Sequence, residues 1–287
     1  MAARPGRTDV GRLAGRFREL RLRGECALLP FVTAGDPDLE FTEALVLALV
    51  GAGADGIELG VPFSDPIADG PTIQRSSQRA LASRTSLRRI LELVRRLRPK
   101  LNVPLVLMGY ANPFFAMGEE RFAAAAAEVG VDGVICPDLP PEEGETFYAA
   151  LEARGIDPIL LAAPTTRPER LALLTGRTRG FLYYVALTGV TGARAGVSTD
   201  LRAGVSRVRA LSEISVCVGF GISTPEQARE IAGYADGIVV ASAIIDRMES
   251  VEAREDKLDV ATRFVAELKA ALAVLPSIPT SRGRSGS

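Results

Sequence analysis

The 287-residue chain contains no histidine and only three lysines, Lys100, Lys257 and Lys269. The absence of histidine excludes a histidine general base, a histidine-ligated metal and a Ser-His-Asp triad. A lysine that forms a Schiff base must stand in the active site, and none of the three follows a strand-like segment. Proton transfer in this chain therefore falls to carboxylates.

Other features are scarce as well. No apolar run reaches the roughly 18 residues of a membrane span. The net charge of -1 does not indicate a basic surface for binding nucleic acid. Cys26, Cys136 and Cys217 lie apart in apolar segments, which is typical of buried thiols in a reducing compartment; a disulfide or metal role is the alternative. The N-terminus is rich in arginine, but Asp9 and Glu19 interrupt it and no secretory apolar core follows. We expect a cytoplasmic protein.

Eight strand-like runs alternate with segments of helical periodicity. The runs begin near Cys26, Gly56, Val103, Gly133, Asp157, Gly180, Ser215 and Asp236. Most are continuously apolar, as expected for parallel strands covered on both faces. This order predicts an α/β fold, a single (β/α)8 TIM barrel. An open doubly wound sheet is the alternative, although no GxGxxG motif follows the first run.

The barrel is predicted to occupy residues 1–275 and to include an extra N-terminal helix. In that helix Leu13, Phe17 and Leu20 form an apolar face, and the arginines form a solvated one. Thr85 or Ser86 and, later, Thr224 are the expected helix N-caps. Residues 276–287 are rich in Ser, Arg, Gly and Pro, which predicts a disordered tail.

The segment 56–70, GIELGVPFSDPIADG, carries the strongest chemical signal. Glu58 lies inside an apolar run, where an apolar pocket raises a carboxyl pKa and allows proton exchange near neutrality. Asp69 ends the following loop, so both carboxylates can face one ligand. The alternatives are a Glu58 carboxylate bonded to backbone N–H groups and an Asp69 that only forms a turn. Asp65, before Pro66, is expected to shape the turn.

The loops after the last three runs point to an anionic ligand. They contain the glycines Gly189, Gly192, Gly219 and Gly221. With the Ala241-Ser242 turn, their backbone N–H groups can bind phosphate at the usual site of this fold; tight turns alone are the alternative. The long loop 186–196 suits a mobile lid or is simply flexible.

Two aromatic features stay open at this point. Tyr183 and Tyr184 are adjacent, so one points into the barrel and the other outward. Phe31 and Phe220 end the first and seventh runs, where they either cover an aromatic ligand or fill the core.

Six motifs in this order resemble the tryptophan synthase alpha subunit family over about Arg16 to Leu272: PFVTAGDPD, GIELGVPFSDPIADGPTIQ, LMGYANPFF, GVDGVICPDLPPEE, GVTGAR and GFGIS. The resemblance implies a lyase of tryptophan biosynthesis that cleaves indole-3-glycerol phosphate to indole and glyceraldehyde 3-phosphate in a retro-aldol step. It implies that Glu58 is the acid–base residue and that Asp69 accepts the indole N–H. A free-standing lyase and a non-catalytic activator of a beta subunit are the alternatives.

The resemblance also implies a set of substrate-binding residues, with apolar side chains around the indole, a pocket tyrosine, a lid threonine and phosphate turns. These positions are Phe31, Met108, Ile135, Tyr183, Thr191, Gly192, Phe220, Gly221, Ala241 and Ser242. Ala241 stands where the family usually has glycine, and Ala186 stands where serine is common.

The resemblance further implies a partner. No cofactor or metal is expected on this chain, whereas the family's beta subunit carries pyridoxal phosphate and receives indole in an α2β2 complex. The loops 63–69 and 137–143 are expected near that beta subunit. Whether Cys136 touches the ligand stays open.

Overall fold

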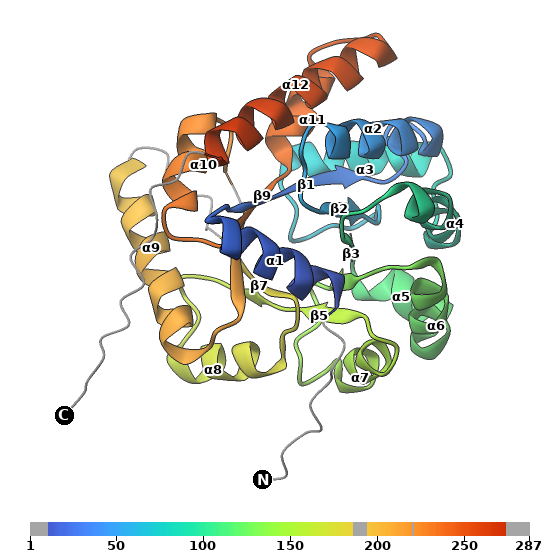
Figure 1. Ribbon diagram of the computed structural model, residues 1–287. Helices are drawn as coiled ribbons and strands as arrows, with labels where there is room; N and C mark the ends of the chain where they lie inside the picture. The colour runs from blue at the N-terminus through green and yellow to red at the C-terminus, as the bar shows by residue number, and fades with distance from the viewer. Residues whose placement is uncertain (1–10, 186–193, 220, 274–287) are drawn as a thin grey trace, which may run out of the picture.

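The computed structural model describes residues 11–185, 194–219 and 221–273, in which parallel strands alternate with helices (Figure 1). The strands are β1 (Ala27–Thr33), β2 (Ile57–Gly60), β3 (Leu105–Met108), β4 (Gly133–Ile135), β5 (Asp157–Ile159), β6 (Leu161–Ala162), β7 (Phe181–Val185), β8 (Ser215–Gly219) and β9 (Gly237–Val240). The helices are α1 (Arg12–Arg23), α2 (Leu39–Gly51), α3 (Pro71–Ala82), α4 (Leu87–Leu97), α5 (Ala111–Met117), α6 (Glu119–Val129), α7 (Glu145–Ala153), α8 (Pro168–Arg177), α9 (Arg194–Leu211), α10 (Pro225–Ala232), α11 (Ser242–Glu249) and α12 (Arg254–Leu272), with a 3-10 turn η1 (Arg98–Lys100) after α4.

The strands form one parallel sheet in the order β5-β4-β3-β2-β1-β9-β8-β7-β6. The two ends of this order are parts of one strand, interrupted at Leu160. The N–H of Leu160 bonds to the Thr178 hydroxyl at 3.1 Å, and its carbonyl accepts from the N–H of Tyr183 at 3.0 Å. These bonds close the ring, so the predicted (β/α)8 barrel of eight strands is confirmed, with its fifth strand divided in two.

The predicted N-terminal helix is α1, and it covers the end of the barrel at which the strands begin (Figure 1). Its apolar face, Leu13, Phe17 and Leu20, is buried as predicted. A Cβ on Gly133 would lie 2.9 Å from Leu13, and one on Gly237 would lie 3.2 Å from Phe17. The helix therefore packs directly against strand backbones that carry no side chain, and it fills this end of the barrel.

A repeated aspartate stands at this same end of the barrel. Asp55, Asp132 and Asp236 each precede a glycine and a β-branched residue at the start of β2, β4 or β9. Each carboxylate accepts a backbone N–H of the neighbouring strand at 2.9 Å. The motif thus ties adjacent strands together, and sequence reasoning missed it, although the repeat of Asp-Gly-Ile and Asp-Gly-Val is visible in the chain.

The arginines of α1 bind these aspartates. Arg16 donates to Asp55 at 2.8 Å, Arg12 to Asp132 at 2.5 Å, and Arg21 lies 3.5 Å from Asp236. The predicted solvated face holds for Arg12 and Arg21, which stay 54% and 56% exposed while they bind, whereas Arg16 is only 26% exposed. Helical periodicity indicates which face is apolar, but it cannot show that the opposite face meets carboxylates more than 30 residues away.

The remaining helices follow the predicted patterns closely. The apolar residues at helical spacing on α4 and α12 are buried: Leu87, Ile90, Leu91, Val94 and Leu97 on α4, and Ala261, Phe264, Val265, Leu268 and Leu272 on α12. Thr224 caps α10 in a capping box with Gln227, and Ser86, not Thr85, is the N-cap of α4. Among the described residues, no helix combines the length and apolar character needed to cross a membrane. The predicted tail, residues 276–287, lies outside the part of the chain that the structure describes.

Candidate active site

Glu58 lies on β2, beside Phe31 of β1 and Val106 of β3 in the strand register. Its side chain is 1% exposed, and neither carboxylate oxygen has a hydrogen-bond partner among the described residues. Burial, and after it the charge of Asp69, raise the pKa of Glu58 to about 8. The alternative of a structural carboxylate bonded to backbone N–H groups does not fit, so Glu58 stands as a protonated acid at neutral pH.

Asp69 ends the loop that follows β2. Its N–H bonds to the carbonyl of Pro66 at 3.1 Å, and its own carbonyl accepts from the Gln74 amide at 2.9 Å. Burial raises the pKa of Asp69 to about 6, while a hydrogen bond from Tyr110 acts in the opposite direction. At neutral pH this group is mainly a carboxylate. The two acids therefore hold different protonation states in one site. Asp65 shapes the same loop, accepting a bond from Ser64.

Tyr110 is a site residue that sequence reasoning missed. It follows β3, next to the β2 loop, and its hydroxyl accepts the Ala68 N–H at 2.9 Å, which leaves its proton for Asp69. The ring stacks on Phe63 with centroids 5.2 Å apart. Tyr110 thus contacts both ends of the loop. The available signal was its place in GYANP, directly after a strand adjacent to β2.

Several predicted pocket residues meet around this loop. Phe31, Asp69, Met108 and Tyr110 line one small cavity of about 10 Å³. Ile135 is buried and lies beside Met108 in the register of β3 and β4. The structure therefore brings three of the four predicted apolar residues to the strand ends near Asp69.

The fold shows which of the two adjacent tyrosines points into the barrel. Tyr183 is buried. Burial is the main reason that the pKa of the Tyr183 hydroxyl is raised above its ordinary value, and the charge of Glu58 is the second. The hydroxyl of Tyr184 instead lies 3.5 Å from Arg207 on α9. Tyr183 thus points into the barrel toward Glu58, and Tyr184 points outward to the helical layer.

The predicted phosphate turns are partly described. Gly221 adopts a φ of +73°, which favours glycine. Ala241 is the N-cap of α11 with a φ of -118°, which lies outside the left-handed region that favours glycine, and Ser242 begins the helix. Thr191, Gly192 and Phe220, with Ala186 and Gly189, lie outside the described residues.

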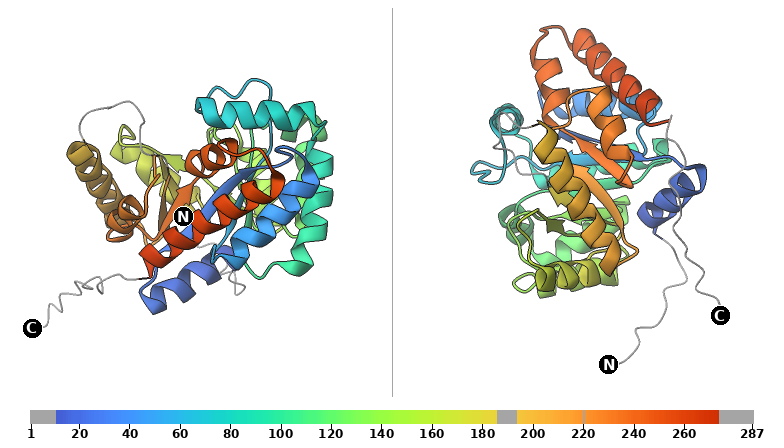
Figure 2. Two further views of the ribbon diagram at one scale, coloured as in Figure 1. Left: turned by 90° about the horizontal axis from the view of Figure 1, so that it is seen from above. Right: turned by 90° about the vertical axis from the view of Figure 1, so that its left-hand side faces the viewer.

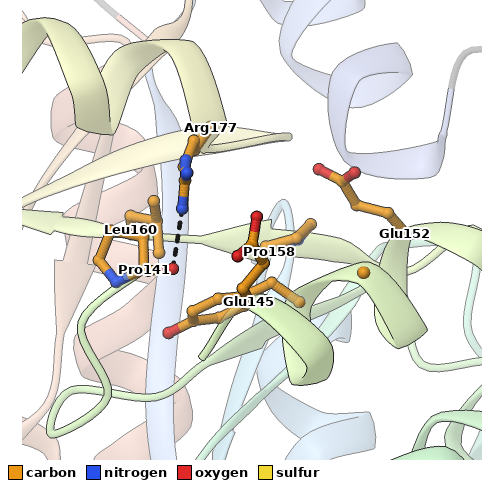
Figure 3. Close-up of a pocket in the computed structure, with 8 residues that line it drawn as sticks. Pro141, Glu145, Glu152, Pro158, Leu160 and Arg177 are labelled. Carbon is orange, nitrogen blue, oxygen red and sulfur yellow. Dashed lines mark hydrogen bonds between the residues drawn. The ribbon is translucent and has the colours of Figure 1, made fainter. Parts of the chain in front are cut away.

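A larger cavity of about 130 Å³ lies elsewhere, between α7, β5 and the end of α8 (Figure 3). Arg177 crosses it to donate to the carbonyl of Pro141 at 2.8 Å, and Glu145 and Glu152 lie on its other side. Neither Glu58 nor Asp69 borders it, so it is separate from the candidate site. Cys136 lies after β4 with its thiol 3.4 Å from Asp138. Across the described ranges, no three acidic or cysteine side chains gather in a way that could hold a metal.

A closed (β/α)8 barrel with one buried and one half-buried acid of different pKa, Glu58 and Asp69, near the carboxyl ends of its strands has the features of a carboxylate acid–base enzyme. Sequence comparison narrows this class. A family model described as "Tryptophan synthase alpha chain" matches residues 17–273. Proteins of that name from Geobacter sp. (strain M21) and Citrifermentans bemidjiense are 55% and 56% identical over 260 residues, which cover 91% of this chain and 97% of each relative.

Structural comparison agrees. The crystal structure of tryptophan synthase subunit alpha from Legionella pneumophila str. Paris superposes with a TM-score of 0.85 at 38% identity, covering 92% of this chain and 99% of that one. A ligand-free tryptophan synthase structure from M. tuberculosis gives a TM-score of 0.84 at 35% identity, covering 92% of this chain and 100% of that one. The chain belongs to the tryptophan synthase alpha chain family. The predicted enzyme class, a lyase of tryptophan biosynthesis, is confirmed with it.

Proposed function

We propose that this chain cleaves indole-3-glycerol phosphate to indole and glyceraldehyde 3-phosphate, with Glu58 and Asp69 as its catalytic residues. The observation that carries the proposal is Glu58: a carboxyl group 1% exposed, without a hydrogen-bond partner among the described residues, whose pKa is raised to about 8. Such a group holds a proton at neutral pH and releases it to a base placed against it.

Glu58 supplies and then recovers one proton. The protonated carboxyl donates to C3 of the indole, which becomes the leaving carbon. The resulting carboxylate then takes the proton of the glycerol hydroxyl next to the breaking bond. The C–C bond electrons return to the indole ring, and the hydroxyl oxygen becomes the aldehyde carbonyl. The proton count balances within the substrate and Glu58, so the step needs no oxidant and no metal.

Asp69 has a different role. With a pKa of about 6, it is ionised at neutral pH and accepts the indole N–H. Protonation at C3 places positive charge on that nitrogen, and a fixed carboxylate beside it stabilises the charge where it develops. Tyr110 orients the Asp69 carboxylate and is a positioning residue in this scheme.

The remaining predicted residues surround the two ends of the substrate. Phe31, Met108, Ile135, Tyr183 and Phe220 contact the indole. The phosphate binds to the backbone N–H groups at Gly192, Gly221, Ala241 and Ser242, and Thr191 closes over the site.

We further propose that a beta subunit docks over this end of the barrel, in an α2β2 complex with pyridoxal phosphate on the beta subunit. Two exposed apolar side chains support this surface: Ile67, in the β2 loop, is 87% exposed, and Phe115, on α5, is 41% exposed. The loops 63–69 and 137–143 border it. A cytoplasmic location stays a prediction.

The test is indole release from indole-3-glycerol phosphate by the purified chain, alone and with a beta subunit from the same source. We expect slow release by the chain alone and a many-fold rise on addition of the beta subunit. Fast release by the chain alone favours a free-standing lyase. No release under either condition contradicts the proposed reaction and leaves a non-catalytic activator.

A further inference from the structure

Helices α3 and α11 pack against each other on the outside of the barrel, next to the loop that follows β1 (Figures 1 and 2). A network of polar and charged side chains joins these three segments. We call it the α3–α11 clamp; it consists of Thr72, Arg75 and Arg79 on α3, Asp246 and Glu249 on α11, and Asp36 after β1. None of these six residues lines the cavity that Asp69 borders.

The first half of the clamp joins the beginning of α3 to α11. The Thr72 hydroxyl donates to Asp246 at 2.8 Å. One turn later Arg75 donates to Glu249 through Nη2 at 2.6 Å and through Nε at 3.2 Å. Residues three apart on both helices thus meet in register, so the bonds resist sliding as well as separation of the helices.

The second half adds the β1 loop. Arg79 forks onto Asp36 with two bonds of 2.7 Å, and its other terminal nitrogen donates to Glu249 at 2.6 Å. Asp36 is buried, and bidentate charge-assisted bonds of this kind fix orientation more strictly than single ones. Glu249 is shared by two arginines, and hydrogen bonding from Arg75 and Arg79 holds its pKa below its ordinary value. Glu249 is therefore the centre of the network.

The two helices lead to opposite ends of the proposed substrate. α3 begins at Pro71, two residues after Asp69, and Gln74 on α3 donates to the carbonyl of Asp69 at 2.9 Å. α11 begins at Ser242, in the turn proposed for the phosphate. A displacement of one helix relative to the other changes the separation between Asp69 and that turn.

We propose that the α3–α11 clamp sets the separation between Asp69 and the phosphate turn, so that one substrate molecule reaches both at once. Glu249, Arg75 and Arg79 are positioning residues for the reaction in "Proposed function", on which this inference rests. A reaction is faster when the enzyme holds the reacting groups in the productive geometry in advance. A misplacement of about 1 Å can lower the rate by about 10²-fold.

A merely stabilising role has a different signature. The Arg75 and Glu249 side chains are 49% and 25% exposed, and ion pairs with this access to water contribute little to folding. The chain offers a matched control in Glu43 on α2. Glu43 also accepts from two cations, Arg96 at 2.9 Å and Lys100 at 2.7 Å, and is 20% exposed, but it faces α4 and η1.

The experiment compares Glu249→Gln with Glu43→Gln in the full chain, assayed with its beta subunit. Measurements are kcat/KM for indole release, the Kd of glycerol 3-phosphate and the thermal midpoint. We expect Glu249→Gln to lower kcat/KM between about tenfold and 10²-fold. The Kd of glycerol 3-phosphate, which occupies only the phosphate end, should change less than about twofold, because the local turn is intact. Glu43→Gln should leave kcat/KM unchanged.

Two results overturn the inference. One is a kcat/KM for Glu249→Gln equal to that of Glu43→Gln. The other is a Kd for glycerol 3-phosphate that weakens by the same factor as kcat/KM, because the clamp would then only shape the phosphate turn. If Glu249→Gln does not fold, Arg75→Met replaces it with the same expectations. An unaltered chain that releases no indole contradicts the proposed function instead, so the two failures are distinguishable.

Discussion

The two ends of the barrel treat buried carboxylates in opposite ways. Where the strands begin, Asp55 is 2% exposed and bonds to the Leu28 N–H, to Arg16 and to Lys269. Where the strands end, Glu58 is equally buried, and its oxygens have no partner among the described residues. Only two residues lie between the two acids along the chain. The partners, rather than burial, decide that one joins structural elements and the other is available for proton transfer.

This contrast has a physical reason. A buried carboxylate with several donors is stabilised in its charged form, whereas one without donors keeps its proton until the pH is high. The protonated acid in the site costs some folding stability above its ordinary pKa, which is typical of functional positions. The paired aspartates at the other end, together with α1, supply a rigid closed ring.

The largest expected effect comes from removing the acid at the reactive end. Glu58→Gln should lower indole release by about 10²–10⁴-fold, because the amide neither gives nor takes the proton. The folding prediction has the opposite sign. Since the folded pKa of about 8 lies above the ordinary 4.5, the unaltered chain loses stability as pH rises from about 4.5 to about 8. The variant should not show this loss.

Steady-state indole release and thermal midpoints between pH 4.5 and 8.5 measure both effects. Near-normal turnover in Glu58→Gln, with the fold intact, would remove Glu58 from the mechanism. An identical fall of the midpoint with pH in both proteins would contradict the unpaired burial of this side chain.

The second effect concerns pH. The proposed mechanism needs Asp69 ionised and Glu58 protonated, so kcat/KM should fall below about pH 6 and above about pH 8. Asp69→Asn should lower activity by about 10²-fold and abolish the acid limb. It should also move the basic limb to lower pH, because the charge that raises the Glu58 pKa is gone. A pH–rate profile of both proteins tests this, and an unmoved basic limb in Asp69→Asn would refute the coupling.

The third effect lies at the opposite end of the barrel. Asp55→Asn removes the charge that Arg16 and Lys269 share, and we expect a loss of about 1–3 kcal/mol in the free energy of unfolding. The kcat of the folded protein should stay within about twofold of normal, since the aspartate is outside the site. Urea titration and kinetics measure the two quantities. A large kcat loss without a stability loss would reverse the assignment of the two ends.

The smallest effect tests the hydroxyl that holds Asp69. Tyr110→Phe keeps the ring on Phe63 and loses the bonds to Ala68 and Asp69, so kcat/KM should fall by about tenfold, the equivalent of one charged hydrogen bond. The acid limb should move to higher pH, because that bond lowers the Asp69 pKa.

Tyr148→Phe is the matched control for that hydroxyl. Tyr148 is buried and donates to the Leu139 carbonyl at 2.7 Å, away from Glu58 and Asp69. The Tyr148→Phe variant should be less stable than the unaltered chain, but the acid limb of its kcat/KM profile should not move. Equal kinetic effects of the two variants would show that Tyr110 only stabilises the fold.

The sequence by itself determined the barrel and singled out the acid that we propose as catalytic. Eight apolar runs separated by helical segments leave little choice of fold, since parallel strands covered on both faces and joined by helices close into this ring. An acid inside an apolar run, in a chain without histidine, marks Glu58, because few other side chains here can move a proton. Both conclusions depend on residues that are neighbours along the chain.

Only the tertiary structure decided which groups meet. Period alone placed Tyr183 and Tyr184 on opposite faces without saying which faces Glu58, and ring closure with its strand register settled it. The partners of the α1 arginines, the Tyr110 contact with the β2 loop and the α3–α11 clamp join residues more than 30 positions apart. Local patterns carry the periodicity of an element, whereas contacts across the barrel depend on strand order, stagger and helix packing, which no single segment contains.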